Sequence, residues 1–290
     1  MKIAVIGLGK AGSELAGMLA AKEASVTGYD KGYLADKGLE AWRRLSDKGI
    51  RLCSSVQDCI EGAALILSLT GESGAMAAAE EVSRFITEEQ NYCDLNLFSP
   101  LDKERIRGIF TKGKISEGTI MKASLKMEGA KTPIYVSGEY GGEVAGILKT
   151  CGLNATYISS RFGAASGLKL IKGIFMKSIE TTLMETAHGA QCLGIQDIFL
   201  REVKNSFKNT SHFDQKLKEM IVTCPNHSKR HGEEVLESKA LLDQLGIDVT
   251  MSKAIAQKFF YVAGLNIDAI LGGQIPEKEE DVLKYLPMQL

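Results

Sequence analysis

The first twelve residues, MKIAVIGLGKAG, constrain the fold of this chain more than any other stretch. Residues 2–6 are β-branched or small and apolar after the initial lysine, which is typical of a strand buried on both faces of a parallel sheet. Gly7, Gly9 and Gly12 follow with G-x-G-x-x-G spacing, and residues 13–20 continue with a helical pattern. The stretch therefore predicts a strand, a tight turn and a helix.

This glycine spacing indicates a dinucleotide site. A sharp turn at Gly7 and the missing side chain at Gly9 let a pyrophosphate approach the backbone, while Gly12 lets the helix pack closely on the strand. The N–H groups at the start of the helix then face the phosphates. We therefore expect this turn to bind the cofactor through Gly7, Leu8, Gly9, Lys10, Ala11 and Gly12.

Asp30 is the expected ribose-binding residue. It follows a second predicted strand, residues 24–29, and comes 18 residues after Gly12. A carboxylate there accepts hydrogen bonds from both ribose hydroxyls of adenosine and repels a 2′-phosphate, so it favours NAD over NADP. NADP stays open because the neighbouring Lys31 is able to hold a phosphate. A solvated turn residue is the alternative role for Asp30.

Two later predicted strands, residues 63–70 and 92–96, end in residues that we expect to border the cofactor. In a doubly wound sheet, ligands lie outside the carboxyl ends of the strands, which here include Leu69, Thr70 and Asn96. The Asn96 amide is expected to reach the nicotinamide ribose or the substrate. An ordinary loop role is the alternative for Leu69 and Thr70.

The pattern of elements changes near residue 159. Eight strand patterns alternate with helices before it, and helical patterns follow at residues 163–193, 196–207, 213–221, 231–245 and 251–265. The prediction is an α/β chain with a Rossmann doubly wound parallel sheet in residues 1–159, followed by an all-helical domain for substrate binding and dimerisation in residues 160–290.

Composition limits the partners that we expect. A net charge of −1 and 24% charged residues give no reason to expect nucleic acid or an anionic membrane. Because the chain starts directly with a strand, and charged residues interrupt its long apolar segment, we expect a cytoplasmic protein with no membrane span. The six cysteines form no C-x-x-C pair. His227 and His231 are spaced i, i+4 without a third ligand, so no metal site is predicted.

Several segments together resemble the β-hydroxyacid dehydrogenase superfamily. They are the glycine turn, Asp30, EGTIM at residues 117–121, GAASGLKLIK at residues 163–172 and the helical second half. The chain is most similar to the 6-phosphogluconate-dehydrogenase-like NAD-binding branch, whose helical C-terminal signature resembles HSKRHGEEVLESKALLDQLGID. The resemblance implies an NAD(P)-dependent homodimer that transfers a hydride between nicotinamide and a small 3-hydroxy acid or a related carbonyl compound.

The resemblance and the positions of neighbouring residues together indicate the substrate-side residues. Lys169 follows the glycine- and alanine-rich turn and would be the general acid/base, and Lys172 on the same helix face would supply a like charge that lowers its pKa. The chain departs from the family at Gly173, where an asparagine usually holds the substrate. It also departs at Met121 and Lys122, which replace a serine and a glycine. Lys122 would hold a substrate carboxylate or phosphate, and all of Met121, Lys122, Lys172 and Gly173 are expected to bind substrate.

Two other functions stay open. Loss of the asparagine at Gly173 is compatible with imine reduction, because the electrophile differs from a carbonyl. It is also compatible with a non-catalytic dinucleotide-binding protein, against which Lys169 argues. A solvated helix stripe is the alternative reading for Lys169 and Lys172.

Overall fold

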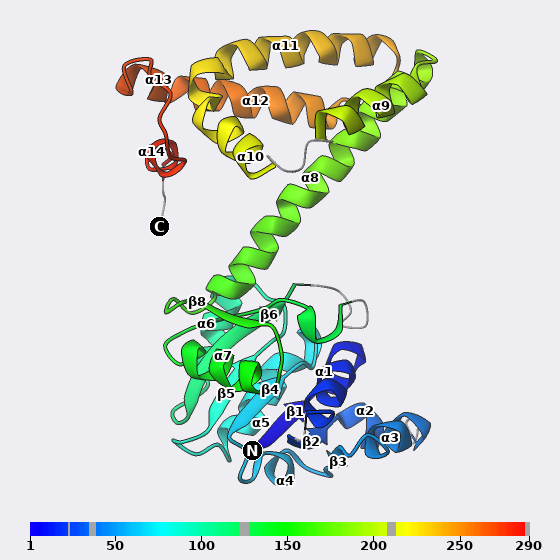
Figure 1. Ribbon diagram of the computed structural model, residues 1–290, viewed down its shortest axis with the longest axis vertical. Helices are drawn as coiled ribbons and strands as arrows, with labels where there is room; N and C mark the ends of the chain where they lie inside the picture. The colour runs from blue at the N-terminus through cyan, green and yellow to red at the C-terminus, as the bar shows by residue number, and fades with distance from the viewer. Residues whose placement is uncertain (23, 35–38, 122–127, 208–212, 288–290) are drawn as a thin grey trace. The chain divides into compact units, whose positions relative to one another are not determined.

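The computed structural model describes residues 1–22, 24–34, 39–121, 128–207 and 213–287 (Figure 1). The chain forms two compact units, residues 1–173 and 174–290. The division falls inside helix α8 (Ala164–Cys192), beyond residue 159 where the alternation of strands and helices ends. The reason is that the first turns of α8 hydrogen-bond to the sheet through Ala165, Ser166 and Lys169.

The first unit is built on a sheet of eight strands in the order β3-β2-β1-β4-β5-β6-β7-β8. This order, with β1 central and crossovers on both sides, is that of a Rossmann fold and confirms the predicted fold class. The strands are β1 (Lys2–Ile6), β2 (Ser25–Tyr29), β3 (Arg51–Leu52), β4 (Leu65–Ser68), β5 (Asn91–Asp94), β6 (Lys114–Ile120), β7 (Ile134–Ser137) and β8 (Ala155–Ser159).

One strand pair departs from the parallel arrangement. β6 and β7 are antiparallel, with Glu117 opposite Ser137, whereas every other neighbouring pair in the sheet is parallel. A parallel pair needs a crossover connection, usually a helix. The described part of the β6–β7 connection carries only the short 3-10 turn η2 (Gly129–Lys131). The antiparallel pair brings Ser137 next to Glu117, which matters for the site below.

Helices cover both faces of this sheet because its strands are apolar on both sides. One apolar core packs beneath α1 (Lys10–Ala20), α3 (Leu39–Ser46) and α7 (Gly141–Thr150) and includes Val5, Leu15, Leu45 and Leu148. The second packs beneath α4 (Val56–Ile60), α5 (Ala75–Ser83) and α6 (Pro100–Arg107) and includes Ile6, Val56, Ala79 and Ile106. The short α2 (Lys31–Leu34) and the 3-10 turn η1 (Glu72–Gly74) complete the unit.

The regular elements among the described residues of the second unit are all helices, as predicted. Its elements are the C-terminal part of α8 with α9 (Gln196–Phe207), α10 (Phe213–Val222), α11 (Cys224–Gln244), α12 (Thr250–Gly264), α13 (Ile267–Ile270) and α14 (Glu280–Leu283). α11 packs along α12 (Figure 1). The predicted start of α11 at His231 was wrong, because the helix begins at Cys224 with a proline in its first turn. In the described ranges, no helix combines the length and the apolar character that a membrane span requires.

Candidate functional site

The glycine turn after β1 requires glycine at its first and last positions. Gly7 has φ +90°, and a Cβ on it would lie 2.6 Å from the carbonyl carbon of Leu69. A Cβ on Gly12 would lie 1.9 Å from the carbonyl oxygen of Gly7. Without a side chain at Gly7, the turn lies close to the end of β4. Without one at Gly12, α1 packs close to the turn after β1. Both glycines therefore shape the turn itself.

Gly9 has a different role, because a Cβ there would meet no atom within 4 Å. α1 begins at the next residue, Lys10, and no side chain within the described ranges caps it or places an acidic group in its first turn. The first N–H groups of a helix carry a partial positive charge and bind anions. The turn therefore offers open space and amide dipoles where a phosphate would sit.

Asp30 lies against this turn. Its Oδ2 accepts a hydrogen bond from the Leu8 N–H at 2.7 Å, and its Oδ1 accepts one from the Gly32 N–H at 2.7 Å. A carboxylate oxygen has two lone pairs, so each oxygen can accept one more hydrogen bond. The half-buried carboxylate is thus held rigidly while its remaining lone pairs stay able to accept ribose hydroxyls.

A cavity of about 310 Å³ opens beside Gly7 and Asp30 at the carboxyl ends of β1 and β2. Its wall includes Thr70, whose buried Oγ1 has no hydrogen-bond partner among the described residues. The Lys31 ammonium pairs with the Glu81 carboxylate at 3.5 Å on the same wall. An open approach at Gly9, a held carboxylate and an unpaired hydroxyl fit an adenine dinucleotide. The cavity is lined by Ile6, Gly7, Tyr29, Asp30, Lys31, Val56, Thr70, Ser73, Gly74, Ala77, Ala78 and Glu81.

Asn96 lies buried just beyond the end of β5, and its amide is engaged within the protein. The Oδ1 accepts from the Gly71 N–H at 2.8 Å, and the Nδ2 donates to the Ser68 Oγ at 3.2 Å and to the Asp94 Oδ2 at 2.9 Å. These bonds hold the loop after β4, which contains Thr70. The Leu69 N–H joins the same edge by donating to the Ile6 carbonyl at 2.7 Å. The reach of the Asn96 amide toward a nicotinamide ribose stays a prediction.

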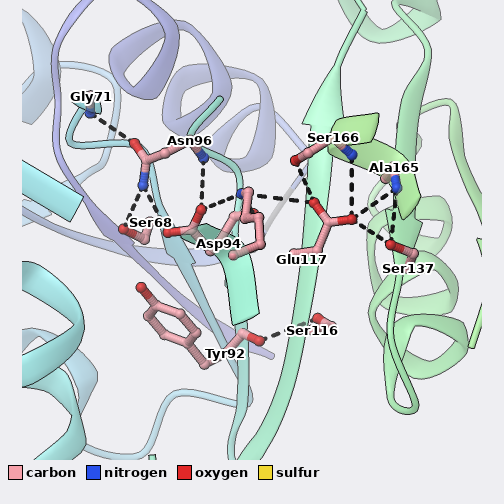
Figure 2. Close-up of polar contacts among 11 residues, drawn as sticks. Ser68, Gly71, Tyr92, Asp94, Asn96, Ser116, Glu117, Ser137, Ala165 and Ser166 are labelled. Carbon is pink, nitrogen blue, oxygen red and sulfur yellow. Dashed lines mark hydrogen bonds and ion pairs between the residues drawn. The ribbon is translucent and has the colours of Figure 1, made fainter. Parts of the chain in front are cut away.

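Next to Asn96 lies a group of three charged side chains, Asp94, Lys103 and Glu117, which we call the buried ionic cluster (Figure 2). All three side chains are 0% exposed. The Lys103 ammonium pairs with the Asp94 carboxylate, donates to the Asp94 carbonyl at 2.9 Å and lies 3.7 Å from the Glu117 Oε2. Because buried charges are costly unless they are paired and hydrogen-bonded, Lys103 stabilises both carboxylates.

Glu117 connects the buried ionic cluster to the start of α8. Its Oε1 accepts from the Ala165 N–H at 2.9 Å and the Ser166 N–H at 3.3 Å, and also from the Ser137 hydroxyl. Its Oε2 accepts from the Ser166 hydroxyl at 2.6 Å. Figure 2 shows the carboxylate between β6 and the first turn of α8. A carboxylate at a helix N-terminus interacts favourably with the helix dipole.

Lys169 lies one turn further along α8. Its amine donates to the Ile120 carbonyl at 2.6 Å, at the end of β6, and burial lowers its pKa below the ordinary lysine value. The side chain is half-buried. Met121, the next residue after Ile120, is half-buried and donates its N–H to the Pro133 carbonyl at 3.0 Å. The structure thus brings Lys169 next to Met121 at one end of the sheet.

The other predicted substrate residues are less informative. Lys122 lies outside the described residues. Lys172 is exposed, and burial of Lys169, rather than a like charge from Lys172, is what lowers the pKa of the Lys169 amine. A Cβ on Gly173 would meet no atom within 4 Å, so the position where the family has an asparagine is sterically open. The substrate-binding roles of these residues stay predictions.

The described residues include no group of three or more His, Cys, Asp or Glu side chains arranged to hold a metal ion. The ring centroids of His227 and His231 are 5.6 Å apart. The His231 ring also packs against the Phe259 ring in an edge-to-face arrangement, with the centroids 5.4 Å apart. The described part of the site therefore consists of the glycine turn, Asp30, the cavity, the buried ionic cluster and Lys169.

Two family models match the chain. Residues 2–114 match the NAD-binding domain of 6-phosphogluconate dehydrogenase, and residues 190–262 match a domain of unknown function, DUF1932. The resemblance to the 6-phosphogluconate-dehydrogenase-like branch with a helical C-terminal domain is thereby confirmed, and the first unit contains an NAD-binding domain.

Solved structures share the fold over nearly the whole chain. A conserved hypothetical protein from Sinorhizobium meliloti is 25% identical with a TM-score of 0.65, over 99% of this chain and 97% of that one. A conserved protein of unknown function, described as structurally similar to 3-hydroxyacid dehydrogenases, is 24% identical with a TM-score of 0.64, over 94% of this chain and 100% of that one. An imine reductase from Myxococcus stipitatus, a variant in complex with NAD+, is 17% identical with a TM-score of 0.68, over 99% of each chain.

Proposed function

We infer, starting from an NAD-binding domain of the 6-phosphogluconate dehydrogenase type followed by a DUF1932 domain, that this protein is an NAD(P)-dependent oxidoreductase. Its substrate is a small 3-hydroxy acid or a related carbonyl compound. The observation that carries the proposal is the half-buried amine of Lys169, with its lowered pKa, in the same compact unit as the glycine turn. An ordinary solvated helix lysine would have neither property.

The cofactor is held by the first unit. The glycine turn and the start of α1 bind the pyrophosphate, Asp30 binds the adenosine ribose, and the cavity beside Thr70 receives the adenine side. The nicotinamide cofactor, when bound, supplies or accepts the hydride. NAD is the favoured form because the Asp30 carboxylate repels a 2′-phosphate. The pairing of Lys31 with Glu81 further reduces the positive charge available to such a phosphate.

Lys169 moves the proton of the reaction. When a carbonyl is reduced, its ammonium donates a proton to the oxygen that becomes the alcohol. When the alcohol is oxidised, the neutral amine takes that proton back. A general acid/base works best when its pKa is near the working pH. Burial lowers the pKa of Lys169 in that direction, and so supports this role.

Imine reduction is the second candidate. It is supported by the shared fold with an imine reductase and by the open space at Gly173, where the family asparagine is missing. The substrate would then carry a carbon–nitrogen double bond in place of the carbonyl. Lys169, held at the end of β6, would then donate its proton to the imine nitrogen while the carbon accepts the hydride.

A homodimer is the proposed assembly. The part of α8 in the second unit exposes a run of large apolar side chains, which monomeric proteins usually cover. These are Ile174, Phe175, Met176, Ile179, Leu183 and Met184. A second copy of the chain would bury them, and light scattering after gel filtration should give twice the mass of one chain. A monomer at micromolar concentration would contradict this part of the proposal.

A substrate screen tests the function. Purified protein is mixed with NAD(H) or NADP(H) and with 3-hydroxy acids, polyols, their carbonyl partners or cyclic imines, and nicotinamide absorbance is followed. Lys169→Met should keep the dissociation constant for the cofactor and lose turnover. The matched control is Lys177→Met, which removes an exposed lysine of the same helix and should keep turnover. Cofactor binding without turnover on any substrate would instead indicate a non-catalytic dinucleotide-binding protein.

A further inference from the structure

We propose that Glu117 is the positioning residue for Lys169: it fixes the first turn of α8 on the sheet and thereby holds the Lys169 amine at the end of β6. The inference rests on the proposed function, in which Lys169 moves the proton. Glu117 is 0% exposed, so it acts through the helix and not on a substrate.

The first argument is that α8 is attached to one strand at two points. The Glu117 carboxylate accepts hydrogen bonds from the backbone N–H groups of Ala165 and Ser166. The Ile120 carbonyl accepts a hydrogen bond from the Lys169 amine. Both acceptors belong to β6, three residues apart. The amine can keep its place on the Ile120 carbonyl only while the preceding turn of the helix stays where Glu117 holds it.

The second argument is the number of donors that converge on one carboxylate. Ala165, Ser137 and Ser166 together supply two backbone N–H groups and two hydroxyls, and the Lys103 ammonium adds its charge. Hydrogen bonds to an ionised acceptor are about twice as strong as neutral ones. An amide or alcohol in place of this carboxylate would lose both its charge and part of its accepting capacity.

The third argument is continuity with the cofactor side. Lys103 also pairs with Asp94, whose carboxylate accepts from the Asn96 amide, and that amide holds the N–H of Gly71 (Figure 2). One chain of hydrogen bonds and ion pairs therefore runs from the loop after β4 to the first turn of α8. The loop that borders the cofactor cavity and the helix that carries Lys169 share one buried support.

A direct test is the pKa of the Lys169 amine, measured by NMR on protein with ¹³C at lysine Cε and assigned by the signal that Lys169→Met removes. Positioning predicts that Glu117→Gln and Glu117→Asp both raise this pKa toward the ordinary lysine value, because a loosened helix gives the amine more water. A purely electrostatic role predicts the opposite for Glu117→Gln, since loss of a nearby negative charge lowers a lysine pKa. It also predicts no change for Glu117→Asp, which keeps the charge and only shortens the side chain.

Glu143→Gln is the matched control, because Glu143 forms an exposed ion pair with Lys114 on the same unit and should leave the Lys169 pKa unchanged. Ser166→Ala is the milder second variant if a substitution of Glu117 prevents folding, and it should raise the pKa by a smaller amount. In the turnover assay, the Glu117 variants should lose about 10- to 100-fold in kcat, the size expected for a misplaced catalytic group. Their dissociation constant for NADH should stay within about twofold, because the glycine turn and Asp30 hold the cofactor and Asp30 is fixed by Leu8 and Gly32 instead of by Glu117.

An unchanged or lowered Lys169 pKa in Glu117→Asp and Ser166→Ala would overturn the inference. The NMR measurement needs neither substrate nor turnover, so it separates the two proposals. If the Lys169 pKa rises in the Glu117 variants and the unchanged protein turns over no substrate, the positioning role is supported and the oxidoreductase function is rejected. If the unchanged protein turns over substrate and the Lys169 pKa does not change in the Glu117 variants, the oxidoreductase function is supported and the positioning role is rejected.

Discussion

Replacing two glycines of the same turn by alanine, one at a time, should affect two different properties, the stability of the fold and the affinity for the cofactor. Gly12→Ala places a methyl group 1.9 Å from the backbone oxygen of Gly7, an atom that cannot move without shifting the turn. Gly9→Ala places a methyl group in open space, with no atom within 4 Å. We therefore expect Gly12→Ala to reduce the stability of the fold and Gly9→Ala to reduce binding of the cofactor.

The magnitudes follow from these distances. Overpacking at Gly12 costs up to about 3 kcal/mol, and the better helix propensity of alanine returns about 1 kcal/mol, so Gly12→Ala should lower the free energy of unfolding by about 2 kcal/mol. At Gly9, replacing a helix N-cap glycine by alanine costs less than about 1 kcal/mol of stability. The methyl group there stands in the way of the pyrophosphate, and we expect a loss of about tenfold in affinity, equal to about 1.4 kcal/mol.

Urea unfolding of the protein without cofactor measures the stability, and calorimetric titration with NAD measures the affinity. Gly12→Ala should be the more destabilised variant in urea, and Gly9→Ala should bind NAD more weakly. If Gly9→Ala unfolds as easily as Gly12→Ala while binding NAD with the affinity of the unchanged protein, the assignment of separate roles to the two glycines is refuted.

Three further predictions concern titration, the buried charges and the thiols. Reduction needs a charged Lys169, so its rate should fall as pH rises through the lowered pKa of that amine, while alcohol oxidation should rise over the same interval; both follow from stopped-flow absorbance. Lys103→Met removes the cation that pairs with the buried carboxylates of Asp94 and Glu117. Urea unfolding should show that the free energy of unfolding falls by about 3–5 kcal/mol. The exposed Cys192 should react with a thiol reagent in the native protein. Cys93, whose thiol pKa burial raises to about 12, should react only after unfolding.

Each of these has a clear contrary result. A reduction rate that does not change with pH, or that changes identically in Lys169→Met, would remove that amine from proton transfer. The control for Lys103→Met is Lys112→Met, an exposed lysine of the same unit. Equal stability of the two variants would mean that the buried cation contributes little. Rapid labelling of Cys93 in the native protein would contradict its burial.

Local features of the fold were predictable from the sequence because neighbouring residues determine them. The β1 strand, the glycine turn and α1 follow from the first twenty residues, and Asp30 could be placed because it directly follows a strand. The start of α4 is local in the same way, since a serine is a favoured residue before a helix and the Ser55 hydroxyl accepts the N–H of Asp58. The start of α11 was misplaced because NHSKRHG, residues 226–232, shows no apolar periodicity that would mark it as helix.

The buried ionic cluster was not predictable from the same patterns. Glu117 receives its partners from residues 20 and 49 positions away, and Lys103 sits in a helix rich in charge, where a solvated lysine is the usual interpretation. The signal available was a glutamate within a short strand of small and apolar residues. Its meaning depends on the antiparallel pairing with β7 and on the packing of α8, and neither is written in the local sequence.

The attachment of α8 to Glu117 also has a consequence for how the protein is made. During synthesis the eight strands leave the ribosome first, yet the carboxylate on β6 has no amide donors from α8 until residues 165 and 166 have emerged. The nucleotide-binding unit therefore finishes folding only after its own last segment, the first turns of α8, has emerged. A chain cut after Ser159 would expose buried charges and should be a poor folder, whereas one that extends to Gly173 keeps the contacts that close the core.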